Sequence, residues 1–347
     1  MSRLPRKVAI GVLAAAVLAG GGAVLARQAT HARLRLPHVS PAALIASALT
    51  ALARGRPQSG SVSATVDLGL PHLIDLPGGT GPLSLLTGTH TLKVWRSADG
   101  LRVSVLEPAG EQALFVSHGH AWAWNFDSLT AYELGRLSPL ARYLIGLLGA
   151  GGAGGPGLEG ILRSELASVA DTTRVEVVGT TSVAGRPAYR LVVAPRQRGT
   201  LVGAIEIDVD SETRLPLAVF VAPRGSDRPA ISVQFTSVSF AAIDPHTFVF
   251  QPPPGVRVER VGARRAGGAL FSGVRRMRTF GRAWASVLAV EVPPLAGSGL
   301  GGLLAGPFLQ LQGPLLSIRV ANRPDRSWIL IGSVPMDRLR ALEIELP

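Results

Sequence analysis

Two histidines flank a glycine at His118-Gly-His120, and they are the side chains best placed to hold a metal ion. A zinc or copper site needs further ligands, yet the first carboxylate that follows them is that of Asp127. The chain also has no cysteine, which excludes disulfides, thiolate nucleophiles and cysteine-based zinc or iron–sulfur sites. The spacing therefore predicts a hairpin turn here and no metal centre.

Serine, histidine and aspartate, the residue types of a hydrolase triad, all occur in the chain, but no sequence motif of a hydrolase is present. No Gly-x-Ser-x-Gly segment frames a serine as a nucleophile. The glycine-rich stretch at 149–157 lacks the Gly-Lys-Ser/Thr ending of a phosphate-binding loop. Carboxylates are sparse, and those on predicted strands alternate outward, which argues against a paired-carboxylate hydrolase. We therefore expect a protein that is not an enzyme and that uses no cofactor.

The formal charge of +12 comes mostly from arginine, and much of it lies between residues 257 and 282. A basic protein binds nucleic acid or an anionic membrane. No nucleic-acid motif is present, and the arginines are not interleaved with aromatic residues along a strand. We therefore expect attraction to an anionic membrane surface and no nucleic-acid partner.

The N-terminus reads as an export segment. Arg3, Arg6 and Lys7 precede residues 8–26, which are uniformly apolar or small and about as long as a membrane-spanning helix requires. Two outcomes stay open, a cleaved signal peptide and a retained membrane anchor. In both, the basic residues stay inside the cell and the remainder is exported, either secreted or held at the extracytoplasmic face of the membrane.

The strongest strand signal lies between residues 174 and 250. Ile205, Ile207 and Val209 alternate with three carboxylates, so one face of this strand meets a core and the other meets water. Similar short strands with turn signals between them occupy the rest of the range. The pattern predicts an antiparallel sheet whose apolar face needs a cover.

Three kinds of segment are available to cover that sheet. Ser40-Pro41 opens an amphipathic helix, because serine caps helices and proline favours their first turn. Residues 140–148 are predicted to form a helix that is apolar nearly all round, and residues 158–170 are predicted to form another. Residues 70–82 are apolar but broken by proline and glycine, which predicts either a loop packed on the core or a mobile flap over an apolar opening.

Trp122, Trp124 and Phe126 are expected to share one face of a strand whose other face carries small residues. Two interpretations stay open. The aromatic residues are packed in a core, or they line a cavity for an apolar ligand.

Two segments resemble a known family. One is Val183-Ala-Gly-Arg-Pro-Ala-Tyr-Arg-Leu-Val-Val-Ala-Pro195, and the other is Ile207-Asp-Val-Asp-Ser-Glu-Thr-Arg-Leu-Pro-Leu217. Their alternating apolar residues and Asp-x-x-Thr-x-Leu-Pro turn resemble the LolA/LolB lipoprotein-carrier superfamily, including exported actinobacterial LolA-like proteins and the N-terminal domain of MucB/RseB-type regulators. The resemblance covers roughly residues 40–256.

The resemblance implies an α+β fold, in which an incomplete antiparallel β-barrel wraps around helices, with extra C-terminal strands. It implies an apolar cavity for acyl chains between sheet and helices, with residues 140–148 as a plug. The side chains expected around such a cavity are Trp95, Phe115, Trp122, Trp124, Phe126, Tyr143, Leu144, Leu147, Ile205 and Ile207.

The predicted domain organisation has five parts: residues 1–26 (signal or anchor), 27–39 (basic spacer), 40–256 (LolA-like domain), 257–282 (basic linker) and 283–347 (small β-rich extension). The predicted function is that of an exported, membrane-associated protein that binds a lipid, an acyl chain or an acylated lipoprotein. The alternative is an RseB-like envelope sensor that binds an anti-sigma factor or another single-span membrane regulator. A purely structural envelope module is a third interpretation.

Overall fold

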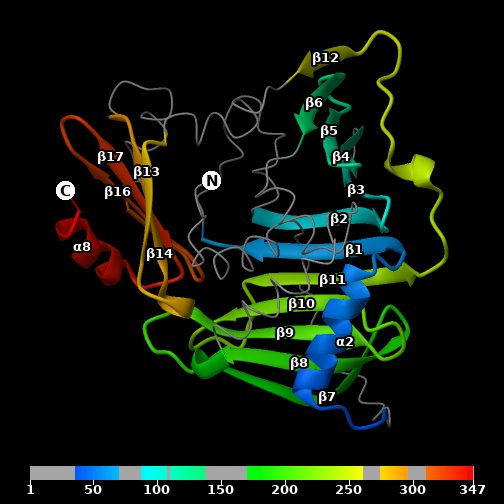
Figure 1. The fold of residues 1–347 in the computed structure, drawn as a ribbon, viewed down its shortest axis with the longest axis horizontal. Helices are drawn as coiled ribbons and strands as arrows, with labels where there is room; N and C mark the ends of the chain where they lie inside the picture. Colours follow the sequence, from blue (N-terminus) through cyan, green and yellow to red (C-terminus); the bar gives the residue numbers. More distant parts are fainter. Residues whose placement is uncertain are drawn as a thin grey trace.

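The chain is mostly β, and it forms two sheets (Figure 1). The computed structural model describes residues 36–69, 87–107, 110–136, 170–260, 274–295 and 310–346. Those ranges contain two α-helices, α2 (Pro41–Ala53) and α8 (Met336–Ile344). Neither helix has the length and apolar character that crossing a membrane requires. The export segment predicted over residues 8–26 lies outside the described ranges.

The large sheet is built around β1 (Gln58–Asp67), which pairs antiparallel with β2 on one side and β11 on the other. The hydrogen-bonded order is β12-β6-β5-β4-β3-β2-β1-β11-β10-β9-β8-β7, and within the described strands only the β12–β6 pair is parallel. The other strands are β2 (Thr87–Arg96), β3 (Gly100–Glu107), β4 (Gly110–Ser117), β5 (His120–Asn125), β6 (Thr130–Arg136), β7 (Thr173–Val183), β8 (Arg186–Pro195), β9 (Val202–Asp210), β10 (Pro216–Pro223), β11 (Ile231–Ser239) and β12 (Arg257–Arg260).

Strand register divides the large sheet into two faces, because successive side chains point to opposite sides. Leu191 pairs with Ile207, which pairs with Val219, and the row continues through Val233 to Ala64. Helix α2 packs on this row, so we call this side the α2 face and the opposite side the outer face. The apolar alternation predicted for β9 thus extends across five adjacent strands.

Helix α2 begins where the sequence predicts. The Ser40 side chain accepts a hydrogen bond from the Ala43 backbone N–H at 3.3 Å, and Pro41 occupies the first turn. Leu44 is fully buried against the strands below, and the Tyr189 hydroxyl donates a 2.9 Å hydrogen bond to the carbonyl of Pro37. The helix is therefore attached to the α2 face by its apolar stripe and by the segment that precedes it.

The C-terminal residues form a second sheet with its own core. Its order is β13-β14-β17-β16-β15, fully antiparallel among the described strands, and α8 packs on one side of it. The core contains Trp328, Leu330, Leu339 and Leu342, all essentially inaccessible to solvent. The strands are β13 (Arg276–Phe280), β14 (Val287–Val292), β15 (Gln310–Gln312), β16 (Ser317–Asn322) and β17 (Ser327–Gly332).

The two sheets are joined through Trp284, which lies in a short 3₁₀ helix, η5 (Ala283–Ala285). Its indole Nε1 donates a buried 2.8 Å hydrogen bond to the Thr173 hydroxyl, and its ring packs with Leu315 against the α2 face. Close by, Gly313 approaches β1 so tightly that an added Cβ would lie 1.7 Å from the Leu68 carbonyl oxygen. The small sheet is therefore docked on one end of the large one.

The predicted α+β barrel agrees with the structure only in part. The described residues are mostly β, and their large sheet is curved but open, with β12 and β7 at its edges. It does not close because no described strand bridges those two edges. The predicted flap at 70–82 and plug helix at 140–148 lie outside the described residues, as does the helix at 158–170 except for Ala170.

The predicted linker at 257–282 needs a correction. Residues Arg257–Arg260 form β12 on the large sheet, and Arg276–Phe280 form β13 on the small sheet. Arginine-rich segments pair in this way because the backbone groups are satisfied in the ladder while the side chains stay in water. Residues 261–273 between the strands lie outside the described residues, and the five-part division of the chain stays a prediction.

We predict that Trp284→Ala lowers the free energy of unfolding by about 3–5 kcal/mol, because it empties a buried aromatic site at the junction. Trp284→Phe keeps most of the ring but leaves Thr173 without its donor, so we expect a loss of about 1 kcal/mol. Met277→Ala, at a half-exposed site on the small sheet, is the control. Urea unfolding measures all three, and equal losses for Trp284→Ala and Met277→Ala would show that this contact does not hold the junction.

Candidate functional site

The side chains predicted to line one apolar cavity lie on two different faces. In register, Trp95 pairs with Arg102, Arg102 with Phe115, and Phe115 with Trp122. This row lies on the outer face. Pairing with β1 places Val94 and Leu92 of β2 on the α2 face, and Trp95 points to the opposite side because successive side chains alternate. Trp124 shares the outer face with Trp122. The expectation that these aromatic residues surround the same cavity as Ile205 and Ile207 is therefore corrected by the register.

The outer-face aromatic residues pack against a segment of the chain itself. The Phe250 ring centroid lies 4.9 Å from that of Phe115, 5.6 Å from that of Trp122 and 5.8 Å from that of Trp124. Arg102 adds a cation–π contact 4.8 Å from the Phe115 ring centroid. Phe115 is buried, but Trp122 and Trp124 stay half-buried, so both interpretations of the aromatic strand remain predictions.

Residues just before Phe250 complete that cover. They form η4 (Pro245–Phe248), and Phe248 is buried against Gly100. A Cβ at Gly100 would lie 2.5 Å from the Phe248 side chain, so glycine is required there for the segment to lie flat. Phe126 lies in the turn after β5, outside the strand, and is 48% exposed.

Two of the predicted cavity residues do lie together on the α2 face. Ile205 is buried in the cluster that includes Trp284 and Leu315. Ile207 is half-buried beneath α2. Tyr143, Leu144 and Leu147 lie outside the described residues, so their place beside this face stays a prediction.

A buried arginine on the α2 face was not predicted. Arg96 is 4% exposed, and its Nε donates a 2.7 Å hydrogen bond to Gln58, which in turn donates to the carbonyl of Pro216. Burial lowers the pKa of Arg96 to about 10, which leaves it charged at neutral pH. No sequence pattern predicts this burial, because the hydrogen-bond partner of Arg96 is Gln58, which lies on the neighbouring strand β1.

The two histidines lie at the β4–β5 hairpin turn, as the spacing predicts. His118 has a positive φ of 49°, its Nδ1 lies 2.8 Å from the Ser117 hydroxyl, and His120 is exposed. Within the described ranges, no three histidine, cysteine, aspartate or glutamate side chains gather in a way that holds a metal ion.

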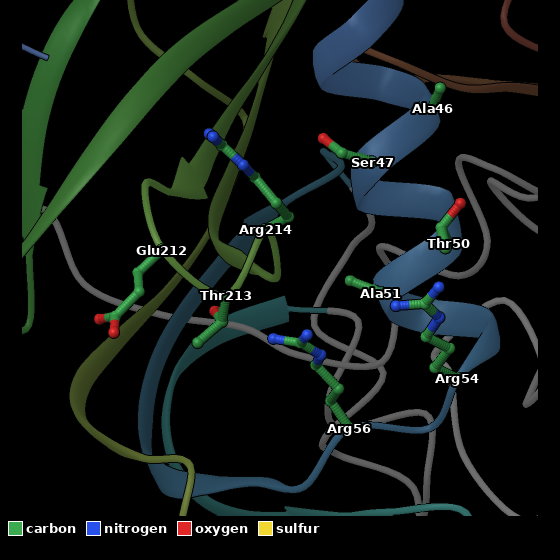
Figure 2. Close-up of a pocket in the computed structure, with 9 residues that line it drawn as sticks. All are labelled: Ala46, Ser47, Thr50, Ala51, Arg54, Arg56, Glu212, Thr213 and Arg214. Carbon is green, nitrogen blue, oxygen red and sulfur yellow. The ribbon is translucent and has the colours of Figure 1, made fainter. Parts of the chain in front are cut away.

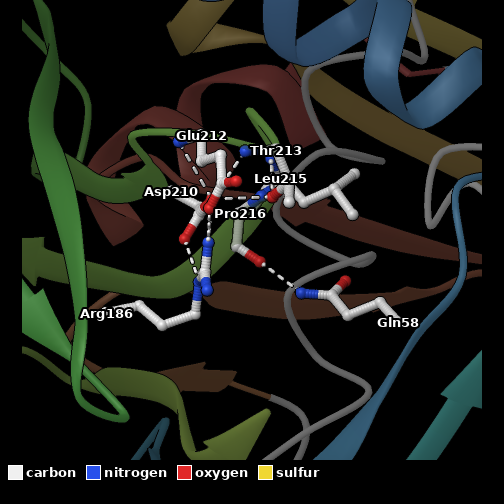
Figure 3. A network of polar contacts seen from close by, with 7 residues as sticks. All are labelled: Gln58, Arg186, Asp210, Glu212, Thr213, Leu215 and Pro216. Atoms are coloured by element: carbon white, nitrogen blue, oxygen red, sulfur yellow. Dashed lines mark hydrogen bonds and ion pairs between the residues drawn. The ribbon is translucent and has the colours of Figure 1, made fainter. Parts of the chain in front are cut away.

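The two segments that carry the family resemblance meet at a buried ion pair (Figure 3). Arg186, which follows the β7–β8 turn, donates from Nε to Asp210 at 2.5 Å and from Nη2 to Glu212 at 2.8 Å. The Asp210 carboxylate is completely buried, and it also accepts bonds from the Thr213 backbone at 2.6 Å and hydroxyl at 2.9 Å. The contacts hold the β9–β10 turn in one conformation.

These contacts change the pKa of both partners. Burial raises the pKa of the Asp210 carboxyl, but the hydrogen bonds from Arg186 and Thr213 outweigh it and the net pKa is lowered. The same carboxylate, with Glu212, raises the pKa of the Arg186 guanidinium. Arg186 is also stacked on Phe240, with its guanidinium carbon 4.9 Å from the ring centroid.

A pocket of about 290 Å³ separates this turn from the second half of α2 (Figure 2). Arginine is the commonest residue type among those that line the pocket. Sequence patterns do not predict this pocket, because its two walls come from segments that are far apart in the chain. The lining residues are Ala46, Ser47, Thr50, Ala51, Arg54, Arg56, Glu212, Thr213 and Arg214.

Comparison with known proteins identifies a similar fold. No model of a known protein family matches the sequence, and no curated protein does. The crystal structure of MucB in complex with MucA(peri) has a TM-score of 0.50 and 16% identity, covering 87% of this chain and 97% of that chain. The Pseudomonas aeruginosa MucA/MucB complex scores 0.49 at 15% identity, with coverage of 87% and 96%. The LolA superfamily protein NE2245 from Nitrosomonas europaea scores 0.25 at 11%, with coverage of 61% and 99%.

The first of these matches shows the fold of this chain. The match covers 87% of this chain, which is more than residues 40–256 make up. The similarity therefore extends into the small C-terminal sheet. The resemblance to MucB/RseB-type proteins that the two sequence segments indicate is therefore confirmed as similarity of fold at low sequence identity.

We predict that Asp210→Asn lowers the free energy of unfolding by about 1–3 kcal/mol at neutral pH. Because the folded-state pKa of Asp210 is lowered, the ionised carboxylate stabilises the fold above about pH 4, and this contribution disappears as the pH falls through the folded-state pKa. The difference between wild type and Asp210→Asn should therefore shrink on acidification, as measured by urea unfolding across a pH series.

The matched control is Glu212→Gln, which alters the exposed partner of the same arginine. We expect a change below about 1 kcal/mol, since water screens that pair. A difference for Asp210→Asn that stays constant down to pH 2 would contradict the assignment.

Proposed function

We propose that this protein is an exported, membrane-associated binding protein that holds a lipid or an acylated protein against the α2 face of its large sheet. The observation that carries the proposal is the continuous apolar row across β8, β9, β10, β11 and β1, much of which is only half-buried. Burial of apolar surface contributes about 25 cal/mol per Å², so an acyl chain laid along such a row gains affinity without any polar contact.

The degree of cover over this row supports the proposal. Helix α2 packs over β7, β8 and β9, and the small sheet packs at one end through Trp284 and Leu315. Between these two covers, Val219 and Val233 remain half-buried. We propose that residues 140–148, with Tyr143, Leu144 and Leu147, form a displaceable cover beside them, and that residues 70–82 act as a flap.

The proposed location is the extracytoplasmic side of the membrane. The basic and apolar N-terminus supports export, as an anchored or a secreted or periplasmic protein. The fold likeness to MucB, which was crystallised with MucA(peri), supports binding as the role rather than catalysis. The net charge of +12 supports contact with an anionic membrane surface.

A second candidate function is that of an envelope regulator that binds a single-span membrane protein, such as an anti-sigma factor. Its supporting observation is that the likeness to MucB covers both sheets and not the larger one alone. A docked second unit gives a partner protein an additional binding surface that a lipid does not need.

For the first function, we predict that delipidated full-length protein takes up fatty acid or phospholipid, detected by native mass spectrometry. Ile207→Ser should weaken fatty-acid affinity about tenfold, because it removes apolar contact on the α2 face. Val192→Ser is the matched control, since Val192 is also half-buried on the adjacent strand but points to the outer face. Absence of any lipid uptake, or equal weakening by both substitutions, would refute the proposal.

For the second function, we predict that the tagged protein recovers one single-span membrane protein from its own membranes. Recovery should be unchanged by delipidation and by Ile207→Ser, because the binding surface would include the small sheet. Recovery that depends on bound lipid would favour the carrier role, and failure to recover any such protein would exclude the regulator.

A further inference from the structure

The pocket between α2 and the β9–β10 turn has an excess of positive charge. Three of its lining residues are arginines, Arg54, Arg56 and Arg214, and its one carboxylate belongs to Glu212. That carboxylate pairs with Arg186 at 2.8 Å. Among the described residues, no carboxylate lies within ion-pair distance of Arg54, Arg56 or Arg214.

The neighbouring groups do not neutralise this charge. Arg186 engages both carboxylates of the turn, those of Asp210 and Glu212. Arg54 is the C-cap of α2, where one cation complements the negative end of the helix dipole. Arg56 and Arg214 lie outside the helix and have no such role, so the pocket remains cationic.

The backbone on both sides of the pocket is fixed before any ligand arrives. Gly55, between two of the arginines, has a φ of 59°, and an added Cβ there would lie 2.8 Å from the backbone of Ala98. Arg214 has a φ of 63°, which is uncommon for a residue with a side chain, and the Asp210 contacts maintain the turn in which it lies. A site with fixed walls loses little conformational entropy on binding.

The side chain of Arg214 is also positioned. Its guanidinium carbon lies 5.0 Å from the centroid of the Tyr189 ring, and its Nη1 is buried without a hydrogen-bond partner among the described residues. Figure 2 shows the turn bearing Arg214 opposite the helix, with Arg56 reaching from the connecting segment toward Thr213 and the Glu212 carboxylate directed away from α2. The guanidinium of Arg214 is thus directed toward Tyr189, those of Arg54 and Arg56 lie on the α2 side, and the Glu212 carboxylate is turned away from α2.

We propose that this pocket binds a phosphoryl group, either that of an anionic phospholipid headgroup or that of a free phosphate. Guanidinium groups bind phosphate oxygens through paired, charge-assisted hydrogen bonds, and two arginines flanking one glycine present several such donors. A volume of about 290 Å³ accommodates a headgroup and not a whole lipid. The lining residues include none of the apolar row on the α2 face, so the site does not require a ligand there.

The test is isothermal titration of full-length protein with inorganic phosphate in one arm and monomeric dihexanoyl phosphatidylglycerol in the other. We expect saturable binding in at least one arm, weakened about tenfold or more by the double substitution Arg54→Gln and Arg56→Gln, which removes charged hydrogen-bond donors. Binding of phosphate identifies a free-phosphate site, and binding of the lipid alone identifies a headgroup site.

The matched control is the double substitution Arg198→Gln and Arg228→Gln, which removes the same charge at exposed positions away from the pocket. This control should bind as wild type does, and unfolding curves should show that all variants are folded. Absence of binding in both arms, or equal weakening by the two double variants, overturns the proposal. Ile207→Ser should leave phosphate binding unchanged, so failure of the apolar site and failure of this one can be told apart.

Discussion

The structure depends on the strand register of its large sheet, which β-bulges interrupt in four of the strand pairs. With twelve strands in one ladder, the pleat assigns every side chain to the α2 face or to the outer face, and a one-residue shift would exchange the two sets. The α2 face collects a continuous row of branched apolar residues, while the outer face carries the aromatic cluster around Phe250. Helix α2, the small sheet and the segment after β11 can each cover only the face that the register presents to them.

The contacts of Asp210 stabilise the β9–β10 turn and so help to maintain the register of these two strands. Asp210 is completely buried, yet it accepts hydrogen bonds from Arg186 and from Thr213, so its charge is compensated. The pair joins the β7–β8 and β9–β10 turns, which belong to neighbouring hairpins. Because Arg186 satisfies the acidic side chains of this region, the nearby arginines on the α2 side are left without carboxylate partners. The Arg186–Asp210 ion pair thus stabilises the turn that forms one wall of the adjacent pocket.

Apolar packing and the Trp284–Thr173 hydrogen bond join the two sheets. Trp284 and Leu315 from the C-terminal part enter the same cluster as Ile205 and Val66 of the large sheet. The small sheet therefore covers part of the α2 face, and any ligand on that face lies between the helix and a second folded unit. This arrangement relates the proposed lipid and partner functions, since both would use surfaces that the junction brings together.

Local patterns in the sequence identify elements reliably here because they depend on neighbours in the chain. The Ser40-Pro41 start of α2, the alternation in β9, the hairpin at His118-Gly-His120 and the two segments that resemble LolA-like and MucB/RseB-type proteins all follow from such patterns. The face on which the aromatic residues lie does not. Trp122 and Ile207 both alternate correctly within their own strands, but only the pairing of β1 with β2 and β11 relates one strand to the other.

The sequence by itself therefore determined the strands, the first helix, the export segment as an expectation, and the resemblance to the fold of MucB. The tertiary structure alone decided that Phe250 covers the aromatic cluster, that Arg96 is buried and that three arginines surround one pocket. The physical reason is that burial and charge compensation depend on residues far apart in the chain. Arg96 is buried and bonds to Gln58 on β1, and the ion pair beside the pocket joins two different hairpins.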